Sequence, residues 1–279
     1  MLHEPLKIEH ITVGLKGLVD DLIGIKIIQL SDLHDDGVRL DNDLFEQCIL
    51  ECNSIKPDLI FLTGDYITNE LDPLEGLLDK LSRLKSKSGV FAILGNHDSY
   101  KVSLRKKMIS ALTSINIEVL WNSYATPLGD NLLIVGLGDL YSGEFKPEKV
   151  FKQLDPNLPR IVLSHNPDTA ELLEKYRVDL QLSGHTHGGQ VILPWIGPLP
   201  RIFSLVQHLF YKIKGEDRYF LGIKHWEWSQ GLHQVGDNLL YVNRGLGSYF
   251  PGRLFCPPEM TVINLENHIP QVEDGRNNP

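Results

Sequence analysis

Short apolar runs alternate with amphipathic stretches through the first half of the chain. A continuous apolar run predicts a strand covered on both faces, whereas an apolar repeat of about 3.6 residues predicts a helix. Strands are therefore expected at Ile25–Leu30, Leu59–Leu62 and Val90–Leu94. Helices are expected between and after them at Leu40–Ile55, Pro73–Leu84 and Ser103–Ser114. This order predicts a parallel sheet built from strand–helix–strand units.

The helix expected at Leu40–Ile55 has clear end signals. Leu44, Cys48 and Cys52 share one apolar face, and Asp41 or Asp43 is expected to cap the N-terminus. Lys56 precedes a proline, and a residue in that position avoids helical backbone angles. The helix is therefore expected to end there.

The second half of the chain is richer in predicted strands. They are expected at Asn131–Leu137, Arg160–Leu163, Val178–Leu182, Val191–Leu193, Tyr219–Lys224, Asn238–Val242 and Met260–Leu265. No linker-like break interrupts the stretch from Ser31 to His187 that carries the polar motifs, so residues 1–266 are expected to form a single domain. Residues 267–279 are polar and contain two prolines, which predicts a flexible tail.

Residues 194–217 depart from this pattern and are expected to form an apolar insertion. Ile202, Leu205, Val206 and Leu209 share one helical face, and basic residues border it at Arg201, Lys212 and Lys214. Core packing is the favoured interpretation of such a face. The alternative is a segment, residues 195–213, that contacts a membrane surface or an acyl chain of the substrate.

Composition narrows the class of protein. The chain has 279 residues, 42% of them hydrophobic, and a net charge of −9, which argues against a nucleic-acid partner. Its three cysteines lack zinc-ligand spacing and are typical of a reducing compartment. We find no signal peptide and no apolar run long enough to span a membrane. A cytoplasmic protein is expected, with membrane contact at most peripheral, and no protein partner is implied.

Polar clusters follow five of the predicted strands or begin the loops after them. They are SDLH (Ser31–His34), GD (Gly64–Asp65), GNHD (Gly95–Asp98), SHNPD (Ser164–Asp168) and GHTH (Gly184–His187). The ends of parallel strands meet at one edge of a sheet, and Asp, His and Asn are ligands for divalent cations. The sequence therefore predicts a metal site. A sixth cluster, GLG at Gly245–Gly247, is expected to lie outside it.

The spacing of these residues suits two ions rather than one. Asp32 and His34 lie two apart in sequence, so they can hold one ion together with His187. Asp65 is expected to bridge, because a carboxylate offers two oxygens. The second ion would be completed by Asn96, His165 and His185. Mn²⁺ is expected first, with Fe, Zn²⁺ or Co²⁺ as alternatives.

Two divalent ions held by so few carboxylates leave an excess of positive charge. That charge attracts a phosphate and favours a hydroxide that bridges the ions. His97 is expected to donate a proton to the leaving group, with Asp98 fixing its tautomer. Asn96, His97 and Arg244 are candidate substrate contacts, although Arg244 is nearly as consistent with a structural role. Asp139 is a candidate supporting residue outside the ligand set.

The ordered clusters resemble the calcineurin-like metallophosphoesterase superfamily. The resemblance covers Asp32 to His187 and implies an α/β fold, a four-layer α/β/β/α sandwich of two mixed sheets flanked by helices. It implies the same ligand positions and the same two ions. Within the superfamily, SHNPD, GHTHGGQ and residues 241–247 resemble the YkuE/YaeI-type bacterial phosphodiesterases, and the arginine-containing motifs of protein phosphatases are missing from the chain.

The expected activity is hydrolysis of a phosphodiester or pyrophosphate bond, on a lipid-linked or nucleotide-sugar substrate. A specific alternative is a UDP-2,3-diacylglucosamine pyrophosphatase of lipid A synthesis. The alternative from another class is a metal-site scaffold without activity. It is disfavoured because the resemblance leaves every ligand position and His97 in place.

Overall fold

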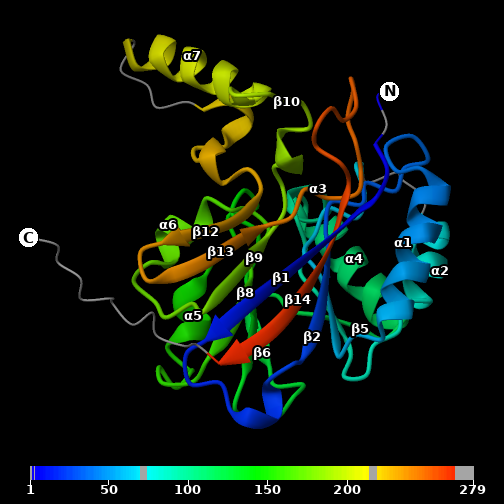
Figure 1. Ribbon diagram of the computed structural model, residues 1–279, viewed down its shortest axis with the longest axis vertical. Helices are drawn as coiled ribbons and strands as arrows, with labels where there is room; N and C mark the ends of the chain where they lie inside the picture. The colour runs from blue at the N-terminus through cyan, green and yellow to red at the C-terminus, as the bar shows by residue number, and fades with distance from the viewer. Residues whose placement is uncertain (1, 3, 70–73, 214–218, 268–279) are drawn as a thin grey trace, which may run out of the picture.

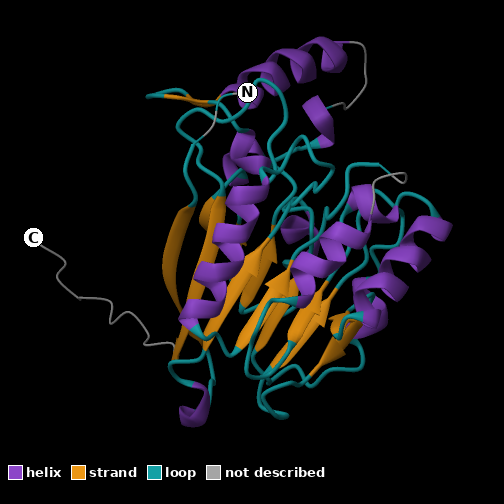
Figure 2. Ribbon diagram, turned by 90° about the vertical axis from the view of Figure 1, so that its right-hand side faces the viewer, coloured by secondary structure: helices purple, strands orange, loops and turns teal. Residues whose placement is uncertain are grey.

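Two six-stranded sheets face one another, and helices cover their outer faces (Figures 1 and 2). The computed structural model describes residues 2, 4–69, 74–213 and 219–267, and the expected tail beyond residue 267 lies outside them. The layers run helix, sheet, sheet, helix, and both sheets are mixed. The predicted fold class is confirmed.

The first sheet has the order β1-β14-β2-β3-β4-β5. Its strands are β1 (Lys7–Leu15), β14 (Glu259–Asn267), β2 (Lys26–Leu30), β3 (Leu59–Leu62), β4 (Val90–Ala92) and β5 (Ile117–Val119). Strands β2 to β5 are parallel, whereas β14 runs antiparallel to β2 and parallel to β1. The parallel strands therefore end at one edge, where the polar clusters begin.

Helices α1 (Asn42–Ile55), α2 (Leu74–Ser82) and α4 (Val102–Ser114) cover the outer face of this sheet. Asp41 caps α1 by accepting the Leu44 N–H at 3.0 Å, one of the two caps that the sequence left open. Cys48 and Cys52 are fully buried against the sheet, as their shared face predicts. The predicted first residue of the second helix, Pro73, lies outside the described residues.

The second sheet has the order β12-β13-β9-β8-β7-β6. Its strands are β12 (Gly231–Val235), β13 (Asn238–Val242), β9 (Leu180–Ser183), β8 (Arg160–Leu163), β7 (Leu133–Gly136) and β6 (Ser123–Ala125). The short helices α5 (Pro147–Phe151) and α6 (Thr169–Leu173) flank it. Arg160–Leu163 and Asn238–Val242 match their predicted bounds.

The main core lies between the two sheets. Large apolar side chains from both, such as Ile27, Phe61, Ile161 and Leu182, are fully buried there, each worth about 1.5–3 kcal/mol of hydrophobic free energy. A polar bridge crosses this core near the strand ends. The Gln29 amide donates to Thr63 Oγ1 at 3.0 Å and to the Ser183 carbonyl at 2.9 Å, and thereby joins the two sheets beneath the predicted site.

Helix α7 (Leu199–Ile213) lies beyond the strand ends, at the top of Figure 1. A small hairpin of β10 (Ile192–Leu193) and β11 (Gly197–Pro198) leads into it. The favoured core interpretation of its apolar face is wrong, since Leu205, Val206 and Leu209 are 64%, 65% and 64% exposed. Among the described residues, we find no helix long and apolar enough to cross a membrane.

One predicted strand is also wrong. Residues 219–224 contain a 3-10 turn, Phe220–Gly222, in which Leu221 has a left-handed backbone with φ of 53°. A residue in that conformation cannot continue an extended strand. The apolar run instead supplies Ile223 to the core and leaves Leu221 exposed.

Candidate metal centre

The predicted ligands stand where strands turn sharply into loops. Five of them have left-handed backbones: Asp32 (φ 50°), His34 (φ 47°), Asp65 (φ 56°), His185 (φ 70°) and His187 (φ 52°). This conformation is uncommon for residues other than glycine, and such strain clusters at functional sites. The surrounding structure must hold these turns, and in doing so it fixes where each side chain points.

Asp32, His34 and His187 form one group of side chains. Their ligand atoms lie within 4.8 Å of one another, and all three residues are buried. The Nε2 atoms of His34 and His187 are 3.2 Å apart, and His187 Nε2 is 3.5 Å from Asp32 Oδ1. This is the set that the sequence assigns to the first ion.

Asp65, His165 and His185 form a second group with the same close spacing. Asp65 Oδ2 lies 3.1 Å from His165 Nε2 and 3.8 Å from Nε2 of His34, which belongs to the first group. One carboxylate oxygen therefore faces both groups. That is the position a bridging ligand needs.

Backbone carbonyls fix the tautomers of two of these histidines. His165 Nδ1 donates to the Thr63 carbonyl at 2.7 Å, and His187 Nδ1 donates to the Gly247 carbonyl at 3.2 Å. A carbonyl can only accept, so each Nδ1 carries a proton, and each Nε2 faces the centre, where it can bind a cation once it is deprotonated. Metal-bound histidines usually have such a partner.

The ligand atoms fit a divalent cation. Asn96 Oδ1 and His185 Nε2 are buried acceptors without a hydrogen-bond partner among the described residues. Buried polar atoms rarely stay unsatisfied, and acceptors pointing at one another repel. A cation among them removes both problems, and oxygen and imidazole donors suit Mn²⁺, Fe and Zn²⁺.

Burial determines the charge state of three of the four candidate-ligand histidines. It lowers the pKa values of His34, His185 and His187 to about 3, so these rings are neutral at pH 7, as ligands must be. His165 differs. Burial opposes its charged form too, but the adjacent Asp65 carboxylate outweighs burial and raises the pKa of His165 to about 10. The same pairing holds the pKa of Asp65 well below its usual range, against the opposing effect of burial.

The predicted contact between Asp98 and His97 is wrong. Asp98 instead accepts the backbone N–H groups of Asp65 at 2.7 Å, Tyr66 at 3.0 Å and Gly95 at 3.0 Å. The Nδ1 of His97 donates to the Thr68 carbonyl at 2.8 Å. Asp98 therefore holds the loop that presents Asp65, and a backbone carbonyl fixes the His97 ring. Burial raises the pKa of Asp98 to about 8, and the neighbouring Asp65 charge acts in the same direction.

Arg244 is engaged by carboxylates rather than facing open space. Its guanidinium lies 2.7 Å from Glu9 Oε1 and 3.0 Å from Glu259 Oε2, and its Nε also donates to the Pro257 carbonyl at 3.0 Å. These contacts join β1, β14 and the loop after β13. They favour the structural interpretation of Arg244 over a substrate contact.

The GLG cluster lies against the metal centre, which corrects the expectation that it stands apart. Gly247 N–H donates to the Asp32 carbonyl at 2.7 Å, and a Cβ on Gly245 would come within 2.6 Å of Asp32 Cβ. Tyr249, two residues later, places its hydroxyl 3.3 Å from His34 Nδ1 and 3.5 Å from His97 Nε2. Sequence reasoning missed Tyr249. Tyr249 lies two residues after the GLG cluster in sequence. That position indicates a role at the site only when the contact between GLG and Asp32 is known.

A cavity of about 510 Å³ opens beside the second group. Its lining includes the metal-ligand candidates Asn96 and His185, the predicted proton donor His97, and the apolar or aromatic side chains Tyr141 and Leu221. Asp139, the candidate supporting residue, is buried nearby and accepts the Ser142 N–H at 2.7 Å.

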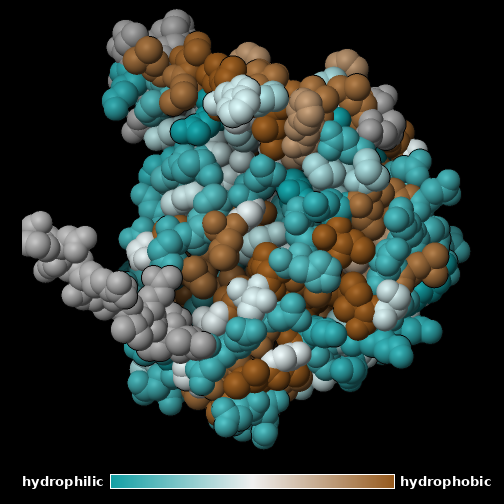
Figure 3. Space-filling view, viewed as in Figure 1, coloured by the Kyte–Doolittle hydropathy of each residue, from teal (hydrophilic) through white to brown (hydrophobic). Residues whose placement is uncertain are grey.

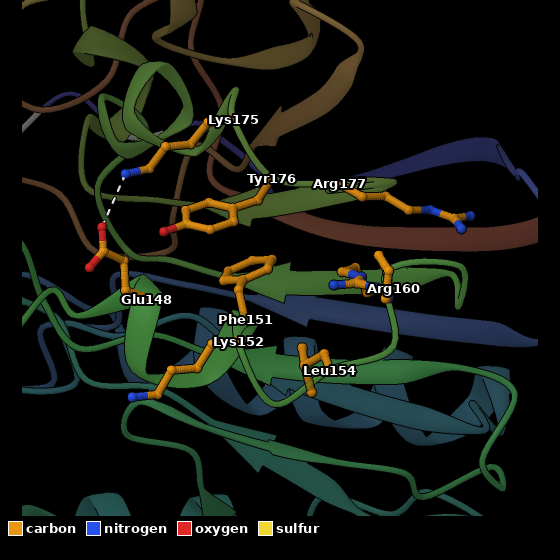
Figure 4. Close-up of a pocket in the computed structure, with 9 residues that line it drawn as sticks. Glu148, Phe151, Lys152, Leu154, Arg160, Lys175, Tyr176 and Arg177 are labelled. Atoms are coloured by element: carbon orange, nitrogen blue, oxygen red, sulfur yellow. Dashed lines mark hydrogen bonds and ion pairs between the residues drawn. The ribbon is translucent and has the colours of Figure 1, made fainter.

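A second cavity of about 470 Å³ lies near Arg160 at the start of β8, the end of this strand that is opposite to the metal centre (Figure 4). Phe151 and Tyr176 stack on each other there, with ring centroids 4.4 Å apart. Its cations are engaged locally: Lys175 pairs with Glu148 at 3.3 Å, and Arg160 donates to the Leu158 carbonyl at 3.1 Å. This cavity lacks the convergent acceptors of the metal centre.

Comparison with known proteins agrees with this geometry. Residues 25–189 match the family model of the calcineurin-like phosphoesterases. This stretch contains both groups of candidate ligands, and it spans more than half of the chain. The chain belongs to the calcineurin-like phosphoesterase family, and it is a metallophosphoesterase, a hydrolase of phosphoric esters.

Three relatives show where in the family it falls. The phosphodiesterase YaeI of Escherichia coli is 35% identical and covers 94% of this chain and 90% of its own. The uncharacterised metallophosphoesterase YkuE of Bacillus subtilis is 35% identical, with coverages of 88% and 80%. The UDP-2,3-diacylglucosamine pyrophosphatase LpxG of Chlamydia trachomatis is 30% identical, with coverages of 92% and 88%. The predicted branch of the family is thereby confirmed.

Proposed function

We propose that this protein uses two divalent ions to hydrolyse a phosphodiester or pyrophosphate bond. The observation that carries the proposal is Asp65 Oδ2, which faces His34 of one group and His165 of the other. One ion would be held by Asp32, His34, Asp65 and His187. The other would be held by Asp65, Asn96, His165 and His185.

The chain's own residues have distinct tasks in this proposal. When bound, the ions supply the positive charge that draws in a phosphate and lowers the pKa of water. Asp98 holds the Asp65 loop through backbone N–H groups. His97 projects from the same edge, its Nδ1 tied to the Thr68 carbonyl, so its Nε2 is the atom that can carry a proton to a leaving oxygen.

The substrate we propose is a nucleotide joined through pyrophosphate to an acylated sugar, of the kind named for LpxG. Two observations support it. The LpxG proteins of two Chlamydia species match at 30% and 31% identity over 92% of this chain. The cavity beside the second group also combines ligand candidates with apolar and aromatic side chains, as an acylated phosphate ester requires.

Two substrates distinguish the reaction class from this particular substrate. The Mn²⁺-loaded protein is expected to hydrolyse bis(p-nitrophenyl) phosphate, a generic diester, and to release UMP from UDP-2,3-diacylglucosamine. Hydrolysis of the diester alone would keep the reaction class and reject the acylated sugar nucleotide. Turnover of neither by protein shown to hold two ions would assign it to the scaffold class.

We also propose Mn²⁺ as the resident metal and the cytoplasm as the location. The donor set of oxygen and imidazole supports the first, and three buried free cysteines support the second, because such thiols persist in reducing compartments. Elemental analysis of protein purified without added metal tests the metal. A cysteine placed on the surface, probed in intact cells with a membrane-impermeant maleimide, tests the location, and labelling would reject it.

A further inference from the structure

The end of the molecule beyond the strand ends carries a surface that we call the apolar cap. It consists of exposed side chains from three segments of the chain: Trp195, Phe203, Leu205, Val206, Leu209, Phe250 and Phe255. Figure 3 shows hydrophobic side chains gathered over α7 and the neighbouring loops at this end. Monomeric proteins rarely expose so many large apolar groups together, and a patch of this kind indicates a surface that binds another molecule or a membrane.

The three segments are joined by backbone contacts. The Ile192 N–H donates to the Leu254 carbonyl at 3.0 Å, which links the hairpin that carries Trp195 to the loop that carries Phe250 and Phe255. The hairpin continues directly into α7. The cap is therefore one surface, although its residues are far apart in sequence.

Helix α7 is oriented opposite to an ordinary surface helix. Ser204 is buried, and Gln207 Oε1 and His208 Nδ1 are buried on the side that faces the protein. Leu205, Val206 and Leu209 point outward. A helix of a soluble domain normally buries its apolar stripe and exposes its polar one. The reversed arrangement is stable where the outer surroundings are themselves apolar.

Charge indicates what those surroundings are. The chain carries a net charge of −9, yet it has no Asp or Glu between Asp179 and Glu216, nor between Asp237 and Glu259. These stretches contain every cap residue. Arg201 and Lys212 are exposed on α7 beside the apolar face. Two acidic residues border the cap: Glu4 accepts the Phe255 N–H, and Glu227 interacts electrostatically with Arg201.

A second copy of the chain fits this surface poorly. A two-fold contact through α7 would bring Arg201 and Lys212 of both copies together, and α7 itself has no acidic residue to pair with them. A bilayer with anionic headgroups accepts both features, because the apolar side chains enter the acyl region and the cations meet phosphates. We propose that the apolar cap docks the protein on an anionic lipid membrane.

Vesicle flotation of the full chain tests this proposal. The wild-type protein is expected to float with phosphatidylcholine vesicles containing phosphatidylglycerol, and less with phosphatidylcholine alone. Leu209→Glu is expected to lower the partition coefficient about tenfold or more, because it removes a leucyl group that would enter the bilayer and adds a negative charge. Leu50→Glu is the matched control, since Leu50 on α1 is 69% exposed and lies outside the cap, and it should float like wild type.

Several outcomes would overturn the proposal. Wild-type protein that stays unbound to anionic vesicles would do so, and so would equal flotation of Leu209→Glu and wild type. A wild-type dimer in sedimentation without lipid, converted to a monomer by Leu209→Glu, would assign the cap to a second copy. Circular dichroism of each variant checks the fold. Flotation needs no turnover, so its failure would leave the proposed hydrolysis standing.

Discussion

At the scale of single residues, Asp65 contacts both groups of candidate ligands and the loop that carries His97. Its Oδ1 accepts the His97 N–H at 2.9 Å, while its Oδ2 faces imidazole nitrogens of both ligand groups. It is buried, and its own backbone N–H donates to Asp98. A single side chain therefore couples the two proposed ion positions to the loop of the proposed proton donor.

The charge state of His165 leads to a prediction about metal binding. The pKa of His165 is raised to about 10, so the metal-free protein carries a proton there at pH 7. Ligation needs the neutral ring, so binding must release at least one proton per chain and affinity must rise with pH up to about 10. Calorimetric titration with Mn²⁺ at pH 7, in two buffers that differ in ionisation enthalpy, measures the release. Equal heats in both buffers would contradict it.

His97 provides a second prediction at this scale. His97→Ala should lower turnover by about 10²-fold or more on a diester with a poor leaving group, and less on a p-nitrophenyl ester, because a good leaving group needs no proton. Metal content should not change, since the backbone N–H that supports Asp65 remains in the variant. Full activity on the poor leaving group would exclude His97 as the acid.

The candidate ligands could be predicted from sequence because their residue types and order restrict the chemistry so strongly. Their supporting contacts could not. Asp98 follows His97 in sequence, yet its carboxylate turns toward backbone N–H groups of another loop. Gly247 and Tyr249 approach the site only because β13 and β9 are neighbours in the sheet. Such contacts depend on which strands pair, and a local motif does not contain that information.

At the scale of elements, the turns after the strands determine the site. The GD and GNHD turns are packed so closely that a Cβ on Gly95 would lie 2.1 Å from Asp65 Oδ1. Only glycine fits there. The conformation of one turn thereby fixes the ligand presented by the next.

This packing predicts opposite effects for two Gly→Ala changes. Gly95→Ala should displace Asp65 and lower both metal content and thermal stability, because the contact is far shorter than van der Waals distance. Gly76→Ala in α2, where the added Cβ meets open space, should stabilise the protein by about 0.5–1 kcal/mol. Thermal denaturation and elemental analysis measure both effects. Normal metal content in Gly95→Ala would refute the proposed packing.

Elements that cross the core were predicted well, and edge elements were not. Strands β3 and β8 are buried at every position, and both have continuous apolar sequences apart from Arg160 at the start of β8. Strand β1 lies at the edge of its sheet and mixes exposed and buried positions, so it has no continuous apolar run and was not predicted. Residues 219–224 show the opposite error. Their apolar content serves a turn beneath α7, where Phe220 lies 5.8 Å from Phe203 between ring centroids, rather than a strand.

At the scale of the whole molecule, the two sheets meet at the metal centre. Asp32 and Asp65 follow strands of the first sheet, whereas His165 and His185 follow strands of the second. Each proposed ion is therefore held by both sheets. Asn96 Oδ1 and His185 Nε2, buried at this edge, have no hydrogen-bond partner among the described residues, and a cation would satisfy them.

Metal removal should consequently weaken the whole fold. With free metal at about 100 times its dissociation constant, each bound ion adds about 2.7 kcal/mol of stability. For a domain of this size that corresponds to a rise of roughly 5–10 °C in Tm. Calorimetry with and without a chelator measures the difference, and Asp65→Asn should show little of it. Identical melting of the wild type with and without metal would mean that the ions do not join the sheets.

We propose that two ions held around Asp65 make this protein a phosphoesterase. The most direct measurement determines metal content and turnover of bis(p-nitrophenyl) phosphate on the same Mn²⁺-loaded samples of wild type and Asp65→Asn. We predict two ions and turnover for the wild type, with fewer ions and turnover lowered by about 10²-fold or more for the variant. Two ions without turnover in the wild type, or two ions retained by Asp65→Asn, would contradict the account.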